Sequence, residues 1–360
     1  MKKTKKALAS LAIASMVMTM IPFNAFAATT VPTRIAGVTA EDTAVKIADQ
    51  TGYTGTAILA SSASYGMVDA LTSGPLAAYL KAPILLTGAG STLDAATKAE
   101  LTKLAVKTVY VTSGTAVIKQ GVLDELKGMN IEVVALGGFD RAATSVNIAQ
   151  KMVGVTKVAI ANGLQDALSI AAVASAANEP ILLTDKEVLP VSVEAFLKAN
   201  SNITSSDIIG GTGIISDAVK AVVPNATRHY GMTAYDTNSQ VIQDFDAALD
   251  YDNVYLANGV TGIDALAGAP LAAQTKSPIV LTDGKTTPAV ATFVFSKASA
   301  TTVVTALGGE AVVPEAVRVG VATGKLTPPS SNELKIVSIS SLDDTNRYLK
   351  MEFSKAVSGL

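Results

Sequence analysis

The sequence predicts an α/β fold built from three tandem, Rossmann-like modules, each a doubly wound parallel sheet. The first observation behind this prediction is an internal repeat with a period of nearly a hundred residues, and the second is the alternation of strand-like and helix-like segments within each copy. The third is composition, because 49% of the residues are hydrophobic but only 5% are aromatic and Trp is absent. A core of Ala, Val, Ile and Leu suits buried parallel strands under closely packed helices.

The repeat rests on three motifs that recur in the same order at spacings of 97 and 98 residues. Asp-Ala-Leu begins at Asp69, Asp166 and Asp264; a Pro-Ile-Leu/Val-Leu-Thr segment begins at Pro83, Pro180 and Pro278; and Ser113-Gly114-Thr115 matches Gly210-Gly211-Thr212 and Gly308-Gly309-Glu310. Because each copy is as long as a domain, each is expected to have its own core. The expected modules are residues 31–130, 131–223 and 224–323.

The first copy shows the order of elements. Runs of apolar and β-branched residues predict strands at 57–60, 83–87, 106–111 and 131–136. Apolar residues at helical spacing predict helices at 43–50, 68–80, 93–104 and 116–126. The helix after Asp-Ala-Leu consists of small residues, so it can lie close to a neighbouring element, including one from the next module.

The N-terminus has the pattern of a secretory signal peptide at residues 1–27. Four Lys residues precede an uncharged segment at 7–21, and Ala25-Phe26-Ala27 forms a cleavage motif. A membrane anchor is the alternative, but the apolar segment is short and ends near Pro22. Cleavage leaves 24 basic and 30 acidic residues, a net charge of −6. An acidic, exported protein without a further apolar span is not expected to bind nucleic acid or a membrane.

The composition changes after the third copy. Residues 324–332 form a Pro- and Ser-rich linker, and residues 333–360 alternate as two short strands at 334–339 and 348–353. Two strands cannot bury a core alone, so this segment is interpreted as the truncated start of an all-β domain.

Most catalytic and metal-binding chemistry is excluded by residue counts. The sequence has no Cys and a single His, His229, so thiolate and multi-His metal sites are absent and any Ser-His-Asp triad would need this residue. The glycine turns match no nucleotide-binding fingerprint, and no cofactor or metal is expected. The other two copies lack a His at the position of His229, which is therefore expected to be structural or on the surface.

The motifs resemble those of the cell wall binding repeat 2 family, found in tandem threes in exported Gram-positive proteins, including S-layer proteins. The resemblance covers residues 31–322 and includes the openings Arg34-Ile35-Ala36-Gly37, Gly137-Gly138-Phe139-Asp140-Arg141 and Arg228-His229-Tyr230-Gly231. Ala135 replaces the first Arg of the family pattern, and Ala40 and Ala234 replace the second. Each copy therefore offers one of the two family Arg residues.

The resemblance implies three modules around a pseudo-threefold axis that attach an exported protein, without catalysis, to an anionic secondary wall polymer. The C-terminal strands resemble the start of an Ig-like domain of cell-surface proteins. One alternative is an S-layer subunit that mainly self-assembles with other wall subunits, and a less favoured one is a peptidoglycan amidase or amidase modifier. All of these place the protein at the cell wall or surface.

Two sets of residues are candidates for ligand binding. Arg34, Arg141 and Arg228 can hold a phosphate or carboxylate in a bidentate fork, although ordinary ion pairs are equally consistent with them. The turns containing Gly114, Thr115, Gly211, Thr212 and Gly309 follow strands and precede helices, so their backbone N–H groups could bind an anion. Glycines needed only for backbone conformation are the alternative.

Two further sets recur in register at helix starts. Asp69, Asp166 and Asp264 are interpreted mainly as residues that cap or charge the first turn of a helix, with a shared ligand or cation site as the alternative. Thr43, Thr144 and Thr237, each expected just before a helix, receive the same capping interpretation.

Overall fold

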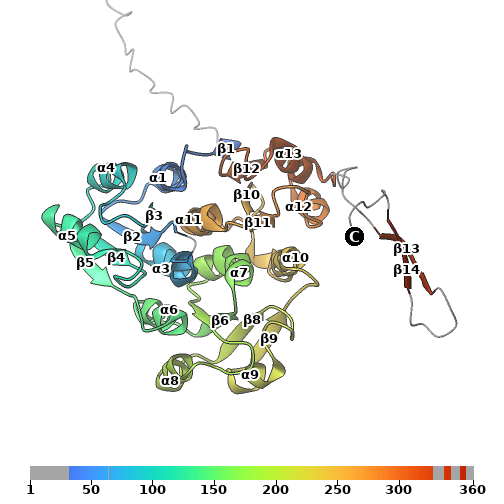
Figure 1. Cartoon of the computed structure of the whole chain (residues 1–360), viewed down its shortest axis with the longest axis horizontal. Helices are drawn as coiled ribbons and strands as arrows, with labels where there is room; N and C mark the ends of the chain where they lie inside the picture. Colours follow the sequence, from blue (N-terminus) through green and yellow to red (C-terminus); the bar gives the residue numbers. More distant parts are fainter. Residues whose placement is uncertain (1–31, 64, 327–335, 342–348, 354–360) are drawn as a thin grey trace, which may run out of the picture. The chain divides into compact units, whose positions relative to one another are not determined.

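A computed structural model describes residues 32–63, 65–326, 336–341 and 349–353 (Figure 1). The predicted signal peptide and most of the predicted linker lie outside the described residues. No described helix combines the length and the hydropathy needed to cross a membrane.

Three four-stranded parallel sheets confirm the predicted α/β class. The first sheet has the order β3 (Ile84–Thr87), β2 (Thr56–Ser61), β4 (Thr108–Val111), β5 (Glu132–Ala135). The second has the order β7 (Ile181–Leu183), β6 (Lys157–Ala161), β8 (Ser205–Ile209), β9 (Ala226–His229). The third has the order β11 (Ile279–Thr282), β10 (Asn253–Asn258), β12 (Val303–Leu307), β1 (Arg34–Ile35). The four strands expected in the first copy correspond to the four strands of the first sheet.

The strand that opens each copy pairs with the sheet of the preceding copy. β5 pairs with β4 and β9 with β8, while β1, at the start of the first copy, pairs with β12 of the third. Arg34 lies opposite Ala306, whose N–H donates to the Thr33 carbonyl. Gly308 N–H donates to the Ile35 carbonyl in the same way. The beginning of the chain therefore completes the sheet formed near its end.

Helices of small residues hold the three copies together. They are α3 (Ser73–Leu80), α7 (Leu164–Ala176) and α11 (Ile263–Gln274), and each packs against the other two (Figure 1). At the contact a Cβ on Gly74 would lie 2.9 Å from Ser175 Oγ and 3.0 Å from Ala269 Cβ. The small residues expected to permit a close approach thus make it between copies.

A second set of helices connects one sheet to the next. These are α1 (Ala40–Thr51), α6 (Arg141–Ala149) and α10 (Ala234–Asp244), which follow β1, β5 and β9. They pack against β3, β7 and β11, the edge strands of the following sheets. Each opening strand lies in one sheet, and the helix that follows it packs on the next sheet. The three copies therefore share one continuous hydrophobic cluster, which includes Ile35, Ile160 and Leu266.

The remaining helices lie on the sheet faces that point away from α3, α7 and α11 (Figure 1). They are α4 (Ala95–Lys103), α5 (Gln120–Gly128), α8 (Val191–Ala199), α9 (Asp217–Val222), α12 (Ala291–Lys297) and α13 (Glu315–Thr323). The helix expected at 68–80 is divided into α2 (Met67–Ala70) and α3. The break falls at Leu71 and Thr72, so α2 corresponds to the first turn of α7.

The C-terminal segment contains an antiparallel pair, β13 (Ile336–Ser341) and β14 (Leu349–Phe353), close to the two strands predicted there. That this pair begins an Ig-like domain remains a prediction.

Candidate functional site

The repeated motifs meet where the strands of each sheet end at their carboxyl termini. In the second sheet the turn at Gly210–Gly213 follows β8, Asp166 lies in the first turn of the helix after β6, and the Gly231–Thr233 turn follows β9. These three segments line a cavity of about 370 Å³, which we term the edge cavity. Its lining includes Asp166, Gly211 and Thr237, which the sequence marks as repeated positions. The carboxyl edge of a parallel sheet is where ligands of α/β proteins commonly bind.

The repeated Asp residues differ in their partners. Asp166 and Asp264 are 8% and 6% exposed, and neither side chain forms a hydrogen bond or ion pair with any described residue. Burial raises the pKa of Asp166 to about 7 and that of Asp264 to about 6. Burial also raises the pKa of Asp69, but a hydrogen bond to Ser113 opposes the increase.

The difference follows from the residue at the position of Ser113. The second and third copies have Gly210 and Gly308 there, each with positive φ. A Cβ on Gly210 would lie only 2.8 Å from Asp166 Oδ2, and one on Gly308 only 2.5 Å from Asp264 Oδ2. These glycines therefore give the two carboxyl groups no hydroxyl like that of Ser113, which opposes the increase in the pKa of Asp69.

The repeated Thr residues lie one turn inside their helices. The side chains that cap α1, α6 and α10 belong to Thr39, Asp140 and Thr233. The helices therefore begin three residues or more before the expected positions, and the Thr39-x-x-Asp42 pattern in the sequence was the signal for the earlier start. The Thr hydroxyls instead accept the N–H of a glycine six residues earlier. The pairs are Gly37 with Thr43 at 2.9 Å, Gly138 with Thr144 at 2.9 Å, and Gly231 with Thr237 at 3.1 Å.

Arg34 and Arg228 occupy equivalent positions and make equivalent internal contacts. Arg34 donates to the Gly308 carbonyl at 2.8 Å and to Glu315 Oε2 at 3.0 Å. Arg228 donates to the Gly210 carbonyl at 2.7 Å and to Asp217 Oδ1 at 3.1 Å, and only 8% of its side chain is exposed. Each guanidinium thus connects an opening strand, β1 or β9, to the turn after the strand that pairs with it. These internal contacts occupy most of the guanidinium donors, so few remain for a polymer.

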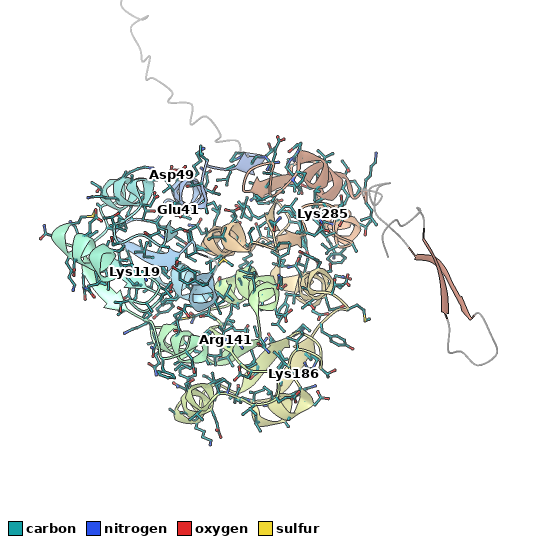
Figure 2. The ribbon with its side chains drawn as sticks, viewed as in Figure 1. Glu41, Asp49, Lys119, Arg141, Lys186 and Lys285 are labelled. Carbon is teal, nitrogen blue, oxygen red and sulfur yellow. The ribbon has the colours of Figure 1, made fainter. Side chains whose placement is uncertain are left out.

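Arg141 occupies a different position, at the first residue of α6. Its guanidinium donates to Asn162 Oδ1 at 2.9 Å, to the Thr184 carbonyl at 3.2 Å and to Asp185 Oδ1 at 3.1 Å. It points toward the turn after β7, which also carries Lys186 (Figure 2). The three candidate Arg residues therefore do not form one repeated set.

The glycine turns share one geometry in all three copies. The carbonyls of Gly114, Gly211 and Gly309 each accept the N–H groups of the residues three and four positions later. Thr115 and Thr212 are exposed at the tips of their turns. The turns that follow β4, β8 and β12 thus lie at the carboxyl edges of the three sheets.

Sequence reasoning missed a repeated apolar residue at the same edges. Val38, Phe139 and Met232 each follow the glycine that donates to the repeated Thr, and they are between 94% and 102% exposed. Met232 lines the edge cavity. The available signal was an apolar residue between a glycine and a helix cap in every copy. Because an exposed apolar side chain recurs at the equivalent place in every copy, these three residues are candidates for a contact surface.

The second copy also contains a buried charge cluster. His229 lies between Asp244, 2.6 Å from Nδ1, and Asp207, 3.3 Å from Nε2, and Lys157 pairs with Asp207. Burial opposes the charged form of both His229 and Asp207. Hydrogen bonds to Asp207 and Asp244 nevertheless raise the pKa of His229. Hydrogen bonds to His229 and Lys157 lower the pKa of Asp207. His229 is thus buried in internal contacts, and the other two copies have uncharged residues at its position.

Glu179 makes this cluster sensitive to pH. Burial, with the nearby Asp207 charge, raises the pKa of Glu179 from 4.5 to about 8, so its proton stabilises the fold at low pH. That contribution is fully present below pH 4.5 and is lost progressively as the pH rises from 4.5 through 8. Because Gln stays neutral, we expect the unfolding temperature of Glu179→Gln to lie several degrees above that of wild type at pH 8.5. At pH 5 the two unfolding temperatures should be nearly equal. The conversion is roughly 2–4 °C for each kcal/mol of unfolding free energy. Thermal unfolding at both pH values measures this. Glu194→Gln on exposed α8 is the control, and equal wild-type and Glu179→Gln midpoints at pH 8.5 would refute the assignment.

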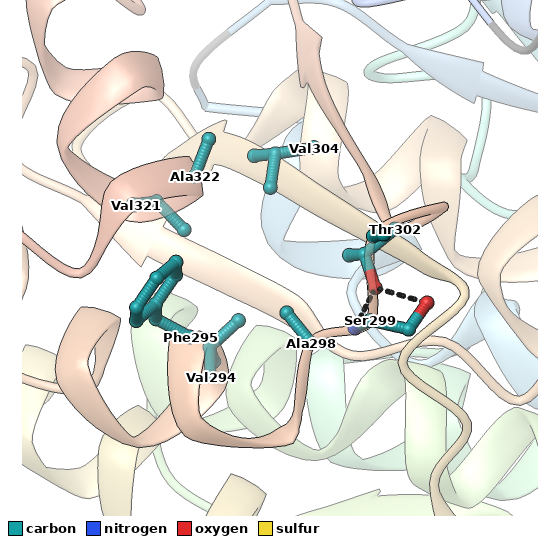
Figure 3. Close-up of a pocket in the computed structure, with 9 residues that line it drawn as sticks. Val294, Phe295, Ala298, Ser299, Thr302, Val304, Val321 and Ala322 are labelled. Atoms are coloured by element: carbon teal, nitrogen blue, oxygen red, sulfur yellow. Dashed lines mark hydrogen bonds between the residues drawn. The ribbon is translucent and has the colours of Figure 1, made fainter.

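A second cavity, of about 420 Å³, lies between α12 and α13 (Figure 3). Its lining is mainly apolar, with Val294, Phe295 and Val321, and contains no ionisable side chain. It therefore offers no chemistry of its own. The described residues also hold no cluster of three or more His, Asp or Glu arranged to bind a metal ion.

Comparison with solved structures gives the same architecture. Cwp6 from Clostridium difficile superposes with a TM-score of 0.74 at 27% identity, over 81% of this chain and 47% of that one. Cwp8 from Clostridium difficile gives 0.70 at 25% identity, over 81% and 52%.

Two curated relatives come from Bacillus subtilis (strain 168). N-acetylmuramoyl-L-alanine amidase LytC is 31% identical over 255 residues, which are 70% of this chain and 50% of the relative. Amidase enhancer is 32% identical over 230 residues, 62% and 31% of the two chains. The chain thus spans half the length or less of these curated relatives.

The family comparison covers most of the chain in three parts. The model of cell wall binding domain 2 (CWB2) matches residues 34–123, 135–220 and 228–318. Each match begins at or next to an opening strand β1, β5 or β9, so the matches follow the structural repeat. The chain belongs to the cell wall binding domain 2 family, as the resemblance of its motifs predicted.

Proposed function

We propose that this chain attaches an exported protein to the bacterial cell wall, without catalysis, by binding an anionic secondary wall polymer. One observation supports the proposal. Each of the three copies that the CWB2 model matches has a glycine turn and an exposed apolar residue at the same edge of its sheet. A rigid array of equivalent sites suits a repeating polymer, because binding at one site raises the effective concentration at the others.

A non-catalytic role agrees with the position of the one imidazole. His229 lies between two carboxylates in a buried cluster, and the edge cavity has no His, Lys or Arg in its lining. No imidazole or amine there could act as a base, and Asp166 is the one titratable side chain in the lining.

The relatives favour one second candidate, a wall-binding part of a peptidoglycan amidase or of an amidase modifier. This candidate predicts release of soluble wall fragments when the chain is incubated with purified walls, or faster release by an added amidase. Attachment alone predicts neither.

The exposed apolar residues provide a test of the binding surface. Replacing Val38, Phe139 and Met232 together by Ser is expected to weaken binding to purified walls at least about tenfold, because all three sites lose a contact. Co-sedimentation of the chain with walls over a range of wall concentrations measures the change. Val153→Ser is the matched control, since Val153 is 69% exposed in the loop before β6, at the amino end of that strand and not at the carboxyl edge. Equal retention of the triple variant and the control would place the binding surface elsewhere.

A further inference from the structure

We propose that the edge cavity of the second sheet binds an uncharged, hydroxyl-bearing sugar unit of the wall polymer, with the Asp166 carboxyl group and backbone N–H groups as its hydrogen-bonding partners. This inference rests on the proposed function and names the group that the chain recognises. It differs from recognition of an anionic group by Arg, because the candidate Arg residues are held in internal contacts.

The cavity offers donors and an acceptor that the protein itself does not use. The first N–H groups of α7, at residues 164–166, have no partner among the described residues, and Gly163 provides no side-chain cap. The N–H groups of Gly211, Thr212 and Gly213 in the facing turn also lack one. Asp166 is 8% exposed, lines the cavity and has no hydrogen-bond or ion-pair partner in the described part of the chain. A buried polar group without a partner costs free energy, which a bound ligand would recover.

The chemistry of the lining distinguishes a hydroxyl from an anion. No Lys or Arg lines the edge cavity, so a phosphate or carboxylate there would be held by backbone N–H groups alone and would meet a like charge whenever Asp166 is ionised. A sugar hydroxyl both donates and accepts, so neighbouring hydroxyls can satisfy Asp166 and the N–H groups together. At about 370 Å³ the cavity lies within the size range of small-molecule sites.

The surrounding surface fits the same ligand. Met232, 94% exposed, lines both this cavity and an adjoining one of about 500 Å³ that Arg228 and Tyr230 also line. The Tyr230 ring lies beside Gly211 and is half exposed. Apolar and aromatic faces of this kind pack against the C–H face of a sugar ring.

The three copies supply an internal control. Asp264 repeats the environment of Asp166, with Gly308 in place of Gly210. Asp69 is instead only half-buried, and the nearby Ser113 hydroxyl opposes the increase of its pKa by burial. Removing the carboxyl group from position 166 is therefore expected to matter for binding, and removing it from position 69 is not.

The test uses nuclear magnetic resonance of the full chain with two probes, N-acetylglucosamine and glycerol 3-phosphate. We expect N-acetylglucosamine to shift the amide signals of residues 164–166 and 211–213, and glycerol 3-phosphate to leave them unchanged. Asp166→Ala is expected to weaken the sugar response at least about tenfold, the effect of one hydrogen bond to a charged group, and Asp69→Ala to leave it unaltered. Thermal unfolding confirms that both variants are folded.

Each contrary result has a separate meaning. Shifts with glycerol 3-phosphate and none with N-acetylglucosamine would overturn the inference, as would an equal sugar response of wild type and Asp166→Ala. Absence of any shift in wild type, in a chain that still sediments with walls, would also overturn it while leaving the proposed function in place. A chain that does not sediment with walls would refute the proposed function itself.

Discussion

Gly74→Leu is expected to lower the free energy of unfolding by about 3 kcal/mol, because it overpacks the place where the three copies meet. A Cβ alone would lie 2.9 Å from Ser175 Oγ on α7 and 3.0 Å from Ala269 Cβ on α11. The remaining atoms of Leu have no space unless α3 moves away from both helices. Chemical denaturation followed by circular dichroism measures the change.

The control for this prediction is Gly128→Leu. Gly128 is exposed at the end of α5, and a Cβ there would meet nothing within 4 Å. The same residue change should therefore alter stability by less than about 1 kcal/mol. Comparable losses in the two variants would show that the contact of α3, α7 and α11 does not hold the copies together.

Ile35→Asn is expected to open the third sheet. Ile35 is 5% exposed in β1, and an amide buried there without a partner costs about 3 kcal/mol together with the lost apolar contacts. The N–H groups of Ala306 and Gly308, which donate to the Thr33 and Ile35 carbonyls, should exchange with solvent much faster. Hydrogen–deuterium exchange of the peptide containing β12 measures this.

Val38→Asn controls for the change to Asn, because Val38 follows β1 by three residues and is 97% exposed. It should leave exchange in β12 unchanged. If Ile35→Asn also leaves exchange at Ala306 and Gly308 unchanged, then β1 does not close the third sheet.

Local patterns predicted the elements but not which copy each one joins. The apolar runs predicted β2 to β5 within a few residues. Burial on both faces explains the continuous runs of β2 and β3, whereas β4 is buried at alternate residues and β5 is half-buried or exposed. No local signal shows that Arg34-Ile35 pairs with a strand some 270 residues later, since the pairing depends on the arrangement of whole copies. The resemblance supplied the threefold arrangement that composition and spacing could not.

At the candidate site the sequence predicted positions better than roles. The repeat singled out Asp166 and Gly211, which the fold brings to one cavity. It could not show that Arg228 is held by Gly210 and Asp217, because these contacts join separate elements. Nor could it show that burial differs among the three repeated Asp residues, with Asp69 half-buried near Ser113 and Asp166 and Asp264 buried beside glycines.

The central claim is that the chain attaches to the wall through its anionic secondary polymer. The direct measurement compares binding of the chain to native walls with binding to walls from which acid has removed that polymer. We predict saturable binding to native walls and at least about a tenfold loss of affinity for stripped walls, since the linked sites lose their common ligand. Equal affinity for the two kinds of wall would contradict the account.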